Sequence, residues 1–340
     1  NNYSIFISRA FLGWHSSDDF LTVVAGKQAN PFYTTDLVWD PDINPQGLTE
    51  TVKFHKLYFG GGSSGAAADY SKDGKSYAAT ESTIHEERPW ELTLNMGEFI
   101  FDDNAEGSFD NDAATDAYLF VGQLVGSYKF GSVKLTIAPG VLFFNAADLS
   151  GLINENPFTD VTGVSGETRK LVILTAPGDV SFKLGTIPAK FYWDFAYNTQ
   201  GKGRADDIYA LFGFNPTTGL AESLHKSEDD FAFLVGAQIG QNKKAGDWSF
   251  TGNYRQTGIA SVDPNLNDSD FALGELNTRG FKAGLGYNLT DFATINATYF
   301  YAWNLRDDLF GGLATGGTSN GGIANGNVIQ IFQLDMNIKF

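Results

Sequence analysis

The sequence predicts an all-β protein, a transmembrane antiparallel β-barrel of about 16 strands, and three observations lead to this prediction. Segments in which apolar and polar residues alternate recur along the chain, as expected for strands with one apolar and one polar face. Many of these segments run for roughly 12–15 residues, whereas strands of globular proteins average ~5–6. Short and long connections alternate between them, which is typical of barrels with short periplasmic turns and long extracellular loops.

The bulk composition fits a single large barrel domain covering residues 1–340. The chain has no Cys, so neither disulfides nor thiolate metal ligands are available. Its net charge of −17 argues against nucleic acid as a partner, because phosphates need Lys and Arg. The sequence contains no run of ~18 apolar residues, so it predicts no membrane-spanning helix. No leader sequence is recognisable, so we expect a mature or shortened form of an exported protein.

Thirteen alternating segments are recognised as strands. They lie near 3–14, 20–28, 51–60, 89–98, 116–130, 132–144, 168–186, 189–199, 230–241, 246–259, 271–289, 291–304 and 327–340. At ~3.3 Å per residue, a tilted strand of ~12 residues crosses an apolar band ~25 Å tall. Bacterial single-chain barrels have even strand numbers, so we expect missing strands at the N-terminal end or one unrecognised strand.

The final segment shows the alternation clearly. Its apolar face carries Val328, Phe332, Leu334, Met336, Ile338 and Phe340. In a closed barrel this strand pairs back to the first strand and turns its apolar face to lipid, since closure removes exposed sheet edges. Several apolar strand ends are aromatic, as Trp90, Tyr197 and Trp248 illustrate, and Tyr and Trp favour the membrane–water interface.

Two N-terminal stretches carry a specific motif. They are RAFLGW (9–14) and AGKQANPFYTTDLVWDPDINPQGL (25–48). Together they resemble the putative porin family of Gram-negative outer membranes. The resemblance implies a diffusion porin in the bacterial outer membrane, a homotrimer, surrounded by membrane lipid and lipopolysaccharide.

The same motif predicts an ordered loop over 29–50. Asn30 and Asp40 each precede a Pro and are restricted to extended conformations. Our hypothesis is that the loop folds inward and narrows the pore; the alternative is that it shields the rim or a trimer contact. The residues expected to form the constriction are Phe32, Tyr33, Asp36, Trp39, Asp40 and Asp42.

Charged residues on the strands predict the pore wall. The expected wall residues are Lys27, Lys53, Glu91, Lys134, Lys183, Asp194, Arg255, Lys282 and Asp335. This wall is mildly basic, whereas most carboxylates lie in the connections, so both signs of ion selectivity stay open. In one acidic connection we expect weak Ca²⁺ binding, and no other cofactor. Its candidate ligands are Asp102, Asp103, Asp110 and Asp112.

Enzymatic activity is not predicted. The four His residues form no HExxH motif, and the sequence has neither a GxSxG elbow nor a phosphate-binding GxxxxGK[ST] loop. The predicted function is passive diffusion of small hydrophilic solutes and ions. Two alternatives remain: a substrate-specific channel, for example for sugars that stack on Phe300 or Tyr192, and a structural barrel that tethers surface partners.

Overall fold

The computed structural model describes residues 8–56, 89–102, 117–146, 171–212, 225–264, 266–306 and 328–338. Within them, fifteen strands form a single antiparallel sheet. The strands are β1 Ala10–His15, β2 Leu21–Lys27, β3 Gln46–Lys53, β4 Trp90–Asp102, β5 Ala117–Phe130, β6 Val133–Ile137, β7 Gly140–Ala146, β8 Val172–Thr175, β9 Gly178–Leu184, β10 Ile187–Asn198, β11 Phe231–Gly240, β12 Trp248–Thr257, β13 Thr278–Thr290, β14 Ala293–Asn304 and β15 Val328–Ile338. The all-β antiparallel prediction is thereby confirmed.

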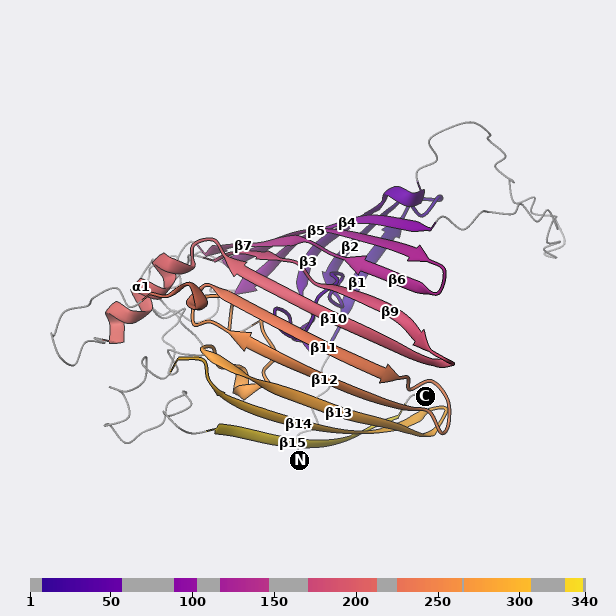
Figure 1. The fold of residues 1–340 in the computed structure, drawn as a ribbon. Coiled ribbons are helices and arrows are strands. Elements are labelled where there is room, and N and C mark those ends of the chain that lie inside the picture. The colour runs from indigo at the N-terminus through magenta and orange to yellow at the C-terminus, as the bar shows by residue number, and fades with distance from the viewer. Residues whose placement is uncertain are drawn as a thin grey trace, which may run out of the picture.

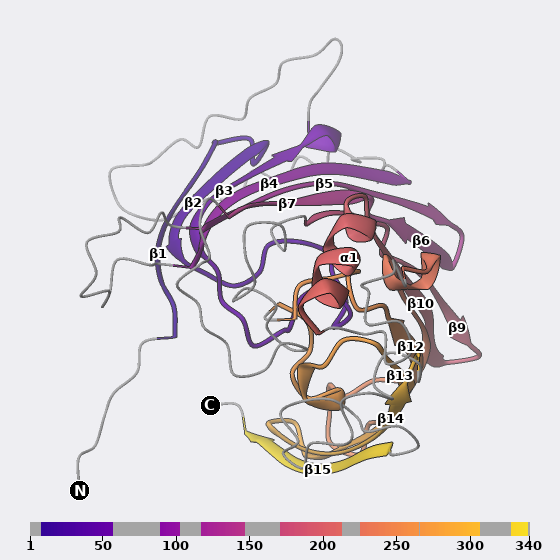
Figure 2. The same cartoon turned by 90° about the vertical axis from the view of Figure 1, so that its left-hand side faces the viewer.

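The sheet order follows the chain, as in an up-and-down meander. The pairs β6/β7 and β8/β9 each act as one interrupted strand, because β5 pairs with both β6 and β7, and β10 pairs with both β8 and β9. Thirteen strand positions result, and they agree with the thirteen segments recognised in the sequence. The sheet bends into a deep arc around a central space (Figures 1 and 2). Among the described residues no pairing joins β1 to β15, so barrel closure and a total of 16 strands stay predictions.

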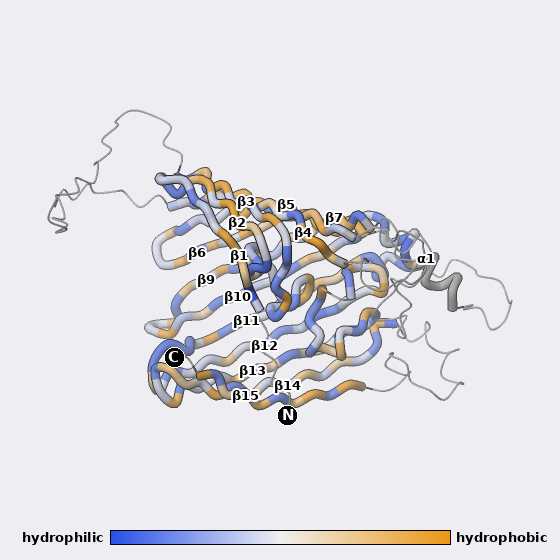
Figure 3. Tube along the Cα trace, turned by 180° about the vertical axis from the view of Figure 1, so that it is seen from behind, coloured by the Kyte–Doolittle hydropathy of each residue, from blue (hydrophilic) through white to orange (hydrophobic). Residues whose placement is uncertain are grey.

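The two faces of the arc differ as the alternation predicts. On β10, Phe191, Phe195 and Tyr197 are exposed on the outside, while Asp194 and Asn198 are buried on the inside. Alternating apolar and polar residues are visible along the strands in Figure 3. The many exposed apolar side chains on the outside fit a bilayer and would be costly in water. Among the helices in the described ranges, none is long and apolar enough to cross a bilayer.

The structure corrects three expectations, two about strand boundaries and one about a connection. The third strand begins at Gln46 and ends at Lys53, rather than covering 51–60. The strand expected at 271–289 is β13, which begins only at Thr278, because Ala272 and Leu273 adopt positive φ angles that break the extended chain before it. The third correction is that the connection after β10 contains a helix, α1 Gly201–Phe212, which the alternating pattern does not predict.

Candidate functional site

The segment 28–45 between β2 and β3 lies inside the arc and is the centre of the candidate site. We call it the inner loop. Its two ends meet, since Gln28 N donates to Pro45 O at 3.0 Å. Asn30, which precedes Pro31, holds the first turn: its Oδ1 accepts from Phe32 N at 2.9 Å. The local sequence thus builds a compact loop on a closed base.

An aromatic cluster anchors the inner loop on the inside of the sheet. Phe32 and Trp39 are almost completely buried and pack on Phe99 of β4, with ring centroids about 6 Å apart. Gly97 makes this approach feasible, because a Cβ there would lie 2.8 Å from the Phe32 ring and 2.6 Å from the Phe99 ring. Leu37 and Val38 extend the cluster. Burial of such side chains stabilises by about 1.5–3 kcal/mol each, so the loop is firmly held.

The first half of the inner loop is tied to the strand wall by polar contacts. Tyr33 exchanges two hydrogen bonds with Gln123 of β5, each 2.8 Å long, and its hydroxyl donates to Asp179 of β9. Burial, together with the hydrogen bond to Asp179, raises the pKa of Tyr33, so the phenol stays a neutral donor. Thr35 Oγ1 donates to Asp194 Oδ2 of β10 at 2.8 Å.

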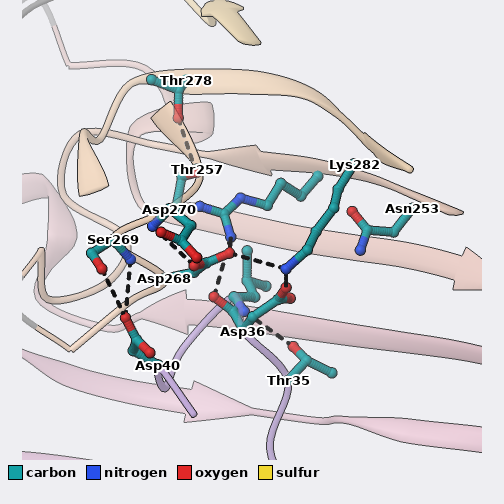
Figure 4. A network of polar contacts seen from close by, with 12 residues as sticks. Thr35, Asp36, Asp40, Asn253, Thr257, Asp268, Ser269, Asp270, Thr278 and Lys282 are labelled. Atoms are coloured by element: carbon teal, nitrogen blue, oxygen red, sulfur yellow. Dashed lines mark hydrogen bonds and ion pairs between the residues drawn. The ribbon is translucent and has the colours of Figure 1, made fainter. Parts of the chain in front are cut away.

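The middle of the inner loop carries an ionic network, shown in Figure 4. Lys282 Nζ of β13 lies 2.6 Å from Asp36 Oδ2 and 3.4 Å from Asp268 Oδ2. Arg255 Nη1 of β12 lies 3.4 Å from Asp268 Oδ2 and donates to Asp36 O at 3.2 Å. Two carboxylates thus face two cations, and all four side chains are at most 22% exposed. Such a group is held in place because moving any one member away from its partners leaves a buried charge without compensation.

The two carboxyls of the network titrate differently. Burial alone would raise the pKa of Asp36, but the charges of Lys282 and Arg255 hold it below its ordinary value. At Asp268 burial outweighs the same two cations and raises the pKa. The Asp36 carboxylate is therefore ionised throughout the neutral range, and the Asp36–Lys282 pair is the stable part of the network.

A second connection, 258–277, also folds inward and covers the inner loop. Ser269 donates through both its N and its Oγ to Asp40 Oδ2, each at 3.1 Å. Asp40 N donates to Leu266 O at 2.7 Å, and Asp268 N donates to Asp36 O at 3.1 Å. Phe271 of this connection packs under the Arg255 guanidinium, 3.7 Å from the ring centroid. Apart from its length, nothing in the sequence of the connection 258–277 predicts this inward path, because its Asp and Asn residues are also typical of an ordinary exposed loop.

The predicted wall residues fall into three groups. Asp194, Arg255 and Lys282 lie under the inner loop. Lys53, Glu91, Lys134, Lys183 and Asp335 lie on the inner face away from it, Lys53 paired with Asp19 and Glu91 with Lys134. The assignment of Lys27 to the wall was wrong. Lys27 is directly opposite Gln46 of β3, which is directly opposite Ile100 of β4. Residues opposite one another share a face, and Ile100 is exposed among the apolar side chains on the outside, so Lys27 also points outward.

Asp42 and the four candidate Ca²⁺ ligands are the predicted site residues still to be placed. Asp42 is exposed, and its backbone N donates to Asp40 Oδ1 at 2.9 Å. Asp103, Asp110 and Asp112 lie outside the described residues, as does the side chain of Asp102. Ca²⁺ binding there stays a prediction.

Three comparisons with known proteins were made. A search among curated proteins finds no match. Among solved structures, the chain resembles one described as "Structure of porin refined at 1.8 angstroms resolution", with 12% identity, a TM-score of 0.37, and coverage of 94% of this chain and 77% of the other. A family model described as "Putative porin" matches residues 1–172, which include β1 to β7, the inner loop and its anchor Phe99. The chain therefore belongs to this putative porin family.

Proposed function

We propose that this porin-like channel lets small hydrophilic solutes and ions diffuse passively across the bacterial outer membrane, and that the inner loop sets the width of its pore. The observation behind the proposal is the position of the inner loop. It is fixed to the inner faces of β4, β5, β9, β10 and β13, so it crosses the space that the sheet surrounds. A loop that only shielded the rim would have no need of partners on so many strands.

The apolar exterior supports a bilayer location, with membrane lipid and lipopolysaccharide around the barrel. The sugar-specific alternative receives less support. Phe300, a wall aromatic on which a sugar could stack, is 1% exposed and covered by Phe271, with ring centroids 6.4 Å apart. Tyr192 is engaged as well, since its hydroxyl accepts from Asn253 Nδ2 at 3.3 Å.

Single-channel recording in planar bilayers tests the proposal directly. We expect steady, ohmic current steps from the purified protein, and graded uptake of sugars by size in liposome swelling. Uptake of one favoured sugar would instead indicate a specific channel. Electrical silence of a demonstrably folded barrel would contradict the diffusion function and favour the tethering role.

We also propose that the outer face of β2 to β4 is where copies of the chain meet in a homotrimer. On the other described strands, Arg279 is the one charged residue on the outer face. Here Lys27, Glu50 and Glu98 share that face, because their strand registers align them with the outward residues Ile100, Met96 and Phe120. Charged side chains facing lipid are costly, whereas charges of opposite sign can pair across a protein interface.

The double variant Glu50→Leu/Glu98→Leu is expected to lose the trimer in sedimentation velocity in density-matched detergent. Gln256→Leu, on the outer face of β12 beside Arg279, serves as the control and should leave the assembly unchanged. A variant that stays trimeric, or a wild type that sediments as a monomer, would contradict this location.

A further inference from the structure

We propose that the turn-side mouth of the lumen selects small anions through a cluster of lysines, despite the acidity of the chain as a whole. This inference rests on the proposed diffusion function and adds the charge of the preferred solute. The cluster, which we call the basic stripe, consists of Lys129 of β5, Lys134 of β6, Lys183 of β9 and Lys190 of β10.

The strand registers bring these four side chains together. Lys129 is directly opposite Lys134, Lys134 is opposite Ser181, and Ser181 is opposite Lys190. Lys183 is two residues from Ser181 and so lies on the same face. Neighbouring strands are ~4.8 Å apart, so the stripe is about 15 Å wide at the turn end of the sheet.

The inward direction of the stripe follows from its sequence neighbours. Tyr128, Phe130, Leu184 and Phe191 alternate with the lysines and are exposed on the apolar outside. The lysines consequently point into the lumen, where water can solvate them. Lys134 is 47% exposed, which fits a side chain at an open mouth rather than in a packed core.

The placement costs stability. Like charges directly opposite on neighbouring strands are unfavourable, yet Lys129 and Lys134 occupy such a pair. One carboxylate offsets them in part, since Glu91 Oε2 lies 3.0 Å from Lys134 Nζ. Lys190 Nζ lies 5.1 Å from the Tyr192 ring centroid. Among the described residues, Lys183 and Lys190 have no carboxylate partner, so their charge faces the solution.

Two carboxylates on the same inner face lie nearer the inner loop and reduce this field only in part. They are Asp179, which accepts from Tyr33 and Ser181, and Asp194, which accepts from Thr35. Asp36 and Asp268 are matched by Lys282 and Arg255. Asp335, on the opposite side of the arc in β15, is the remaining carboxylate at this end among the described inner strand positions. A surplus of positive charge is left on the wall between β5 and β10.

Lysines arranged in this way suit small, hydrated anions. An ammonium group is a compact and strongly hydrated charge on a flexible stem, so each attracts an anion weakly without fixing its geometry. Several weak sites in a row favour entry and still permit exit, which is what conduction requires. The preferred solutes are therefore inorganic anions such as chloride and small monocarboxylates.

The test is the reversal potential of the whole protein in a planar bilayer under a KCl gradient. We expect the wild type to prefer chloride over potassium. Lys183→Gln/Lys190→Gln should lower the chloride-to-potassium permeability ratio by about twofold or more, because the local field sets the concentration of each ion at the mouth. The matched control Lys56→Gln/Lys202→Gln removes two positive charges from residues outside the inner strand face and should leave the ratio unchanged.

The outcomes separate this inference from the proposed function. Conducting channels that prefer potassium, or equal effects of the two double variants, would overturn the basic stripe and leave diffusion intact. No conductance from folded protein would overturn the diffusion function, and the stripe with it.

Discussion

Replacement of residues 30–43 by a short Gly-Ser linker is expected to raise single-channel conductance by about twofold or more, since the narrowest part of a pore limits its current. The design uses the closed base of the inner loop. Because Gln28 N and Pro45 O are joined by a hydrogen bond and Lys27 is paired with Gln46, the linker needs to bridge only neighbouring chain ends. The strands β2 and β3 can then keep their register.

Two controls make this result interpretable. The first control shortens the turn 241–247, which lies at the end of the strands opposite to the inner loop. This change should leave the conductance unaltered. Removal of the inner loop also exposes its apolar anchor Phe99, so folding is checked by heat-modifiable migration in gels. The milder variant Thr35→Val/Asp36→Asn keeps the aromatic cluster and removes two wall contacts; it should give noisier, intermediate conductance. Unchanged conductance in both loop variants would refute the constriction.

The substitution Lys282→Met is expected to lower the free energy of unfolding by about 3 kcal/mol, because removal of one partner from a buried ion pair leaves an uncompensated charge. Here the stranded group is Asp36, whose carboxylate is 2.6 Å from the lysine and 15% exposed. Arg255 alone would then face two carboxylates. Urea unfolding in lipid vesicles, followed by the fluorescence of the six Trp residues, measures the loss.

The double variant Asp36→Asn/Lys282→Met restores the balance of charges and should recover most of the loss. Lys134→Met is the matched control, because its partner Glu91 is 56% exposed and surface pairs contribute little. A Lys282→Met variant no less stable than this control would show that the network carries no stabilising energy.

The sequence was informative wherever one physical rule dominated. Alternation over long strands predicted the thirteen strand positions, and the rigid Asn30-Pro31 and Asp40-Pro41 steps predicted an ordered loop. The same alternation would have placed Lys27 on the outside, since it shares a face with Val23 and Ala25. That error came from treating a charged side chain as evidence of an inner position.

The partners of the inner loop could not be predicted in this way. Asp36 meets Lys282 across 246 residues, and which wall residue it reaches depends on the curvature of the whole sheet. The inward path of 258–277 depends on positive φ angles at Ala272 and Leu273, residue types that rarely adopt them. Neither feature produces a periodic pattern in the sequence from which it could be predicted.

The long separation of Asp36 from Lys282 also dictates an order of assembly. Contacts between residues far apart in the chain form late, since closing so large a loop costs entropy before any contact repays it. The anchor on Phe99 needs only β4, but the ionic network needs β12 and β13 to be in place. We therefore expect the inner loop to be anchored on β4 first, and to be fixed by the ionic network only after β12 and β13 have paired.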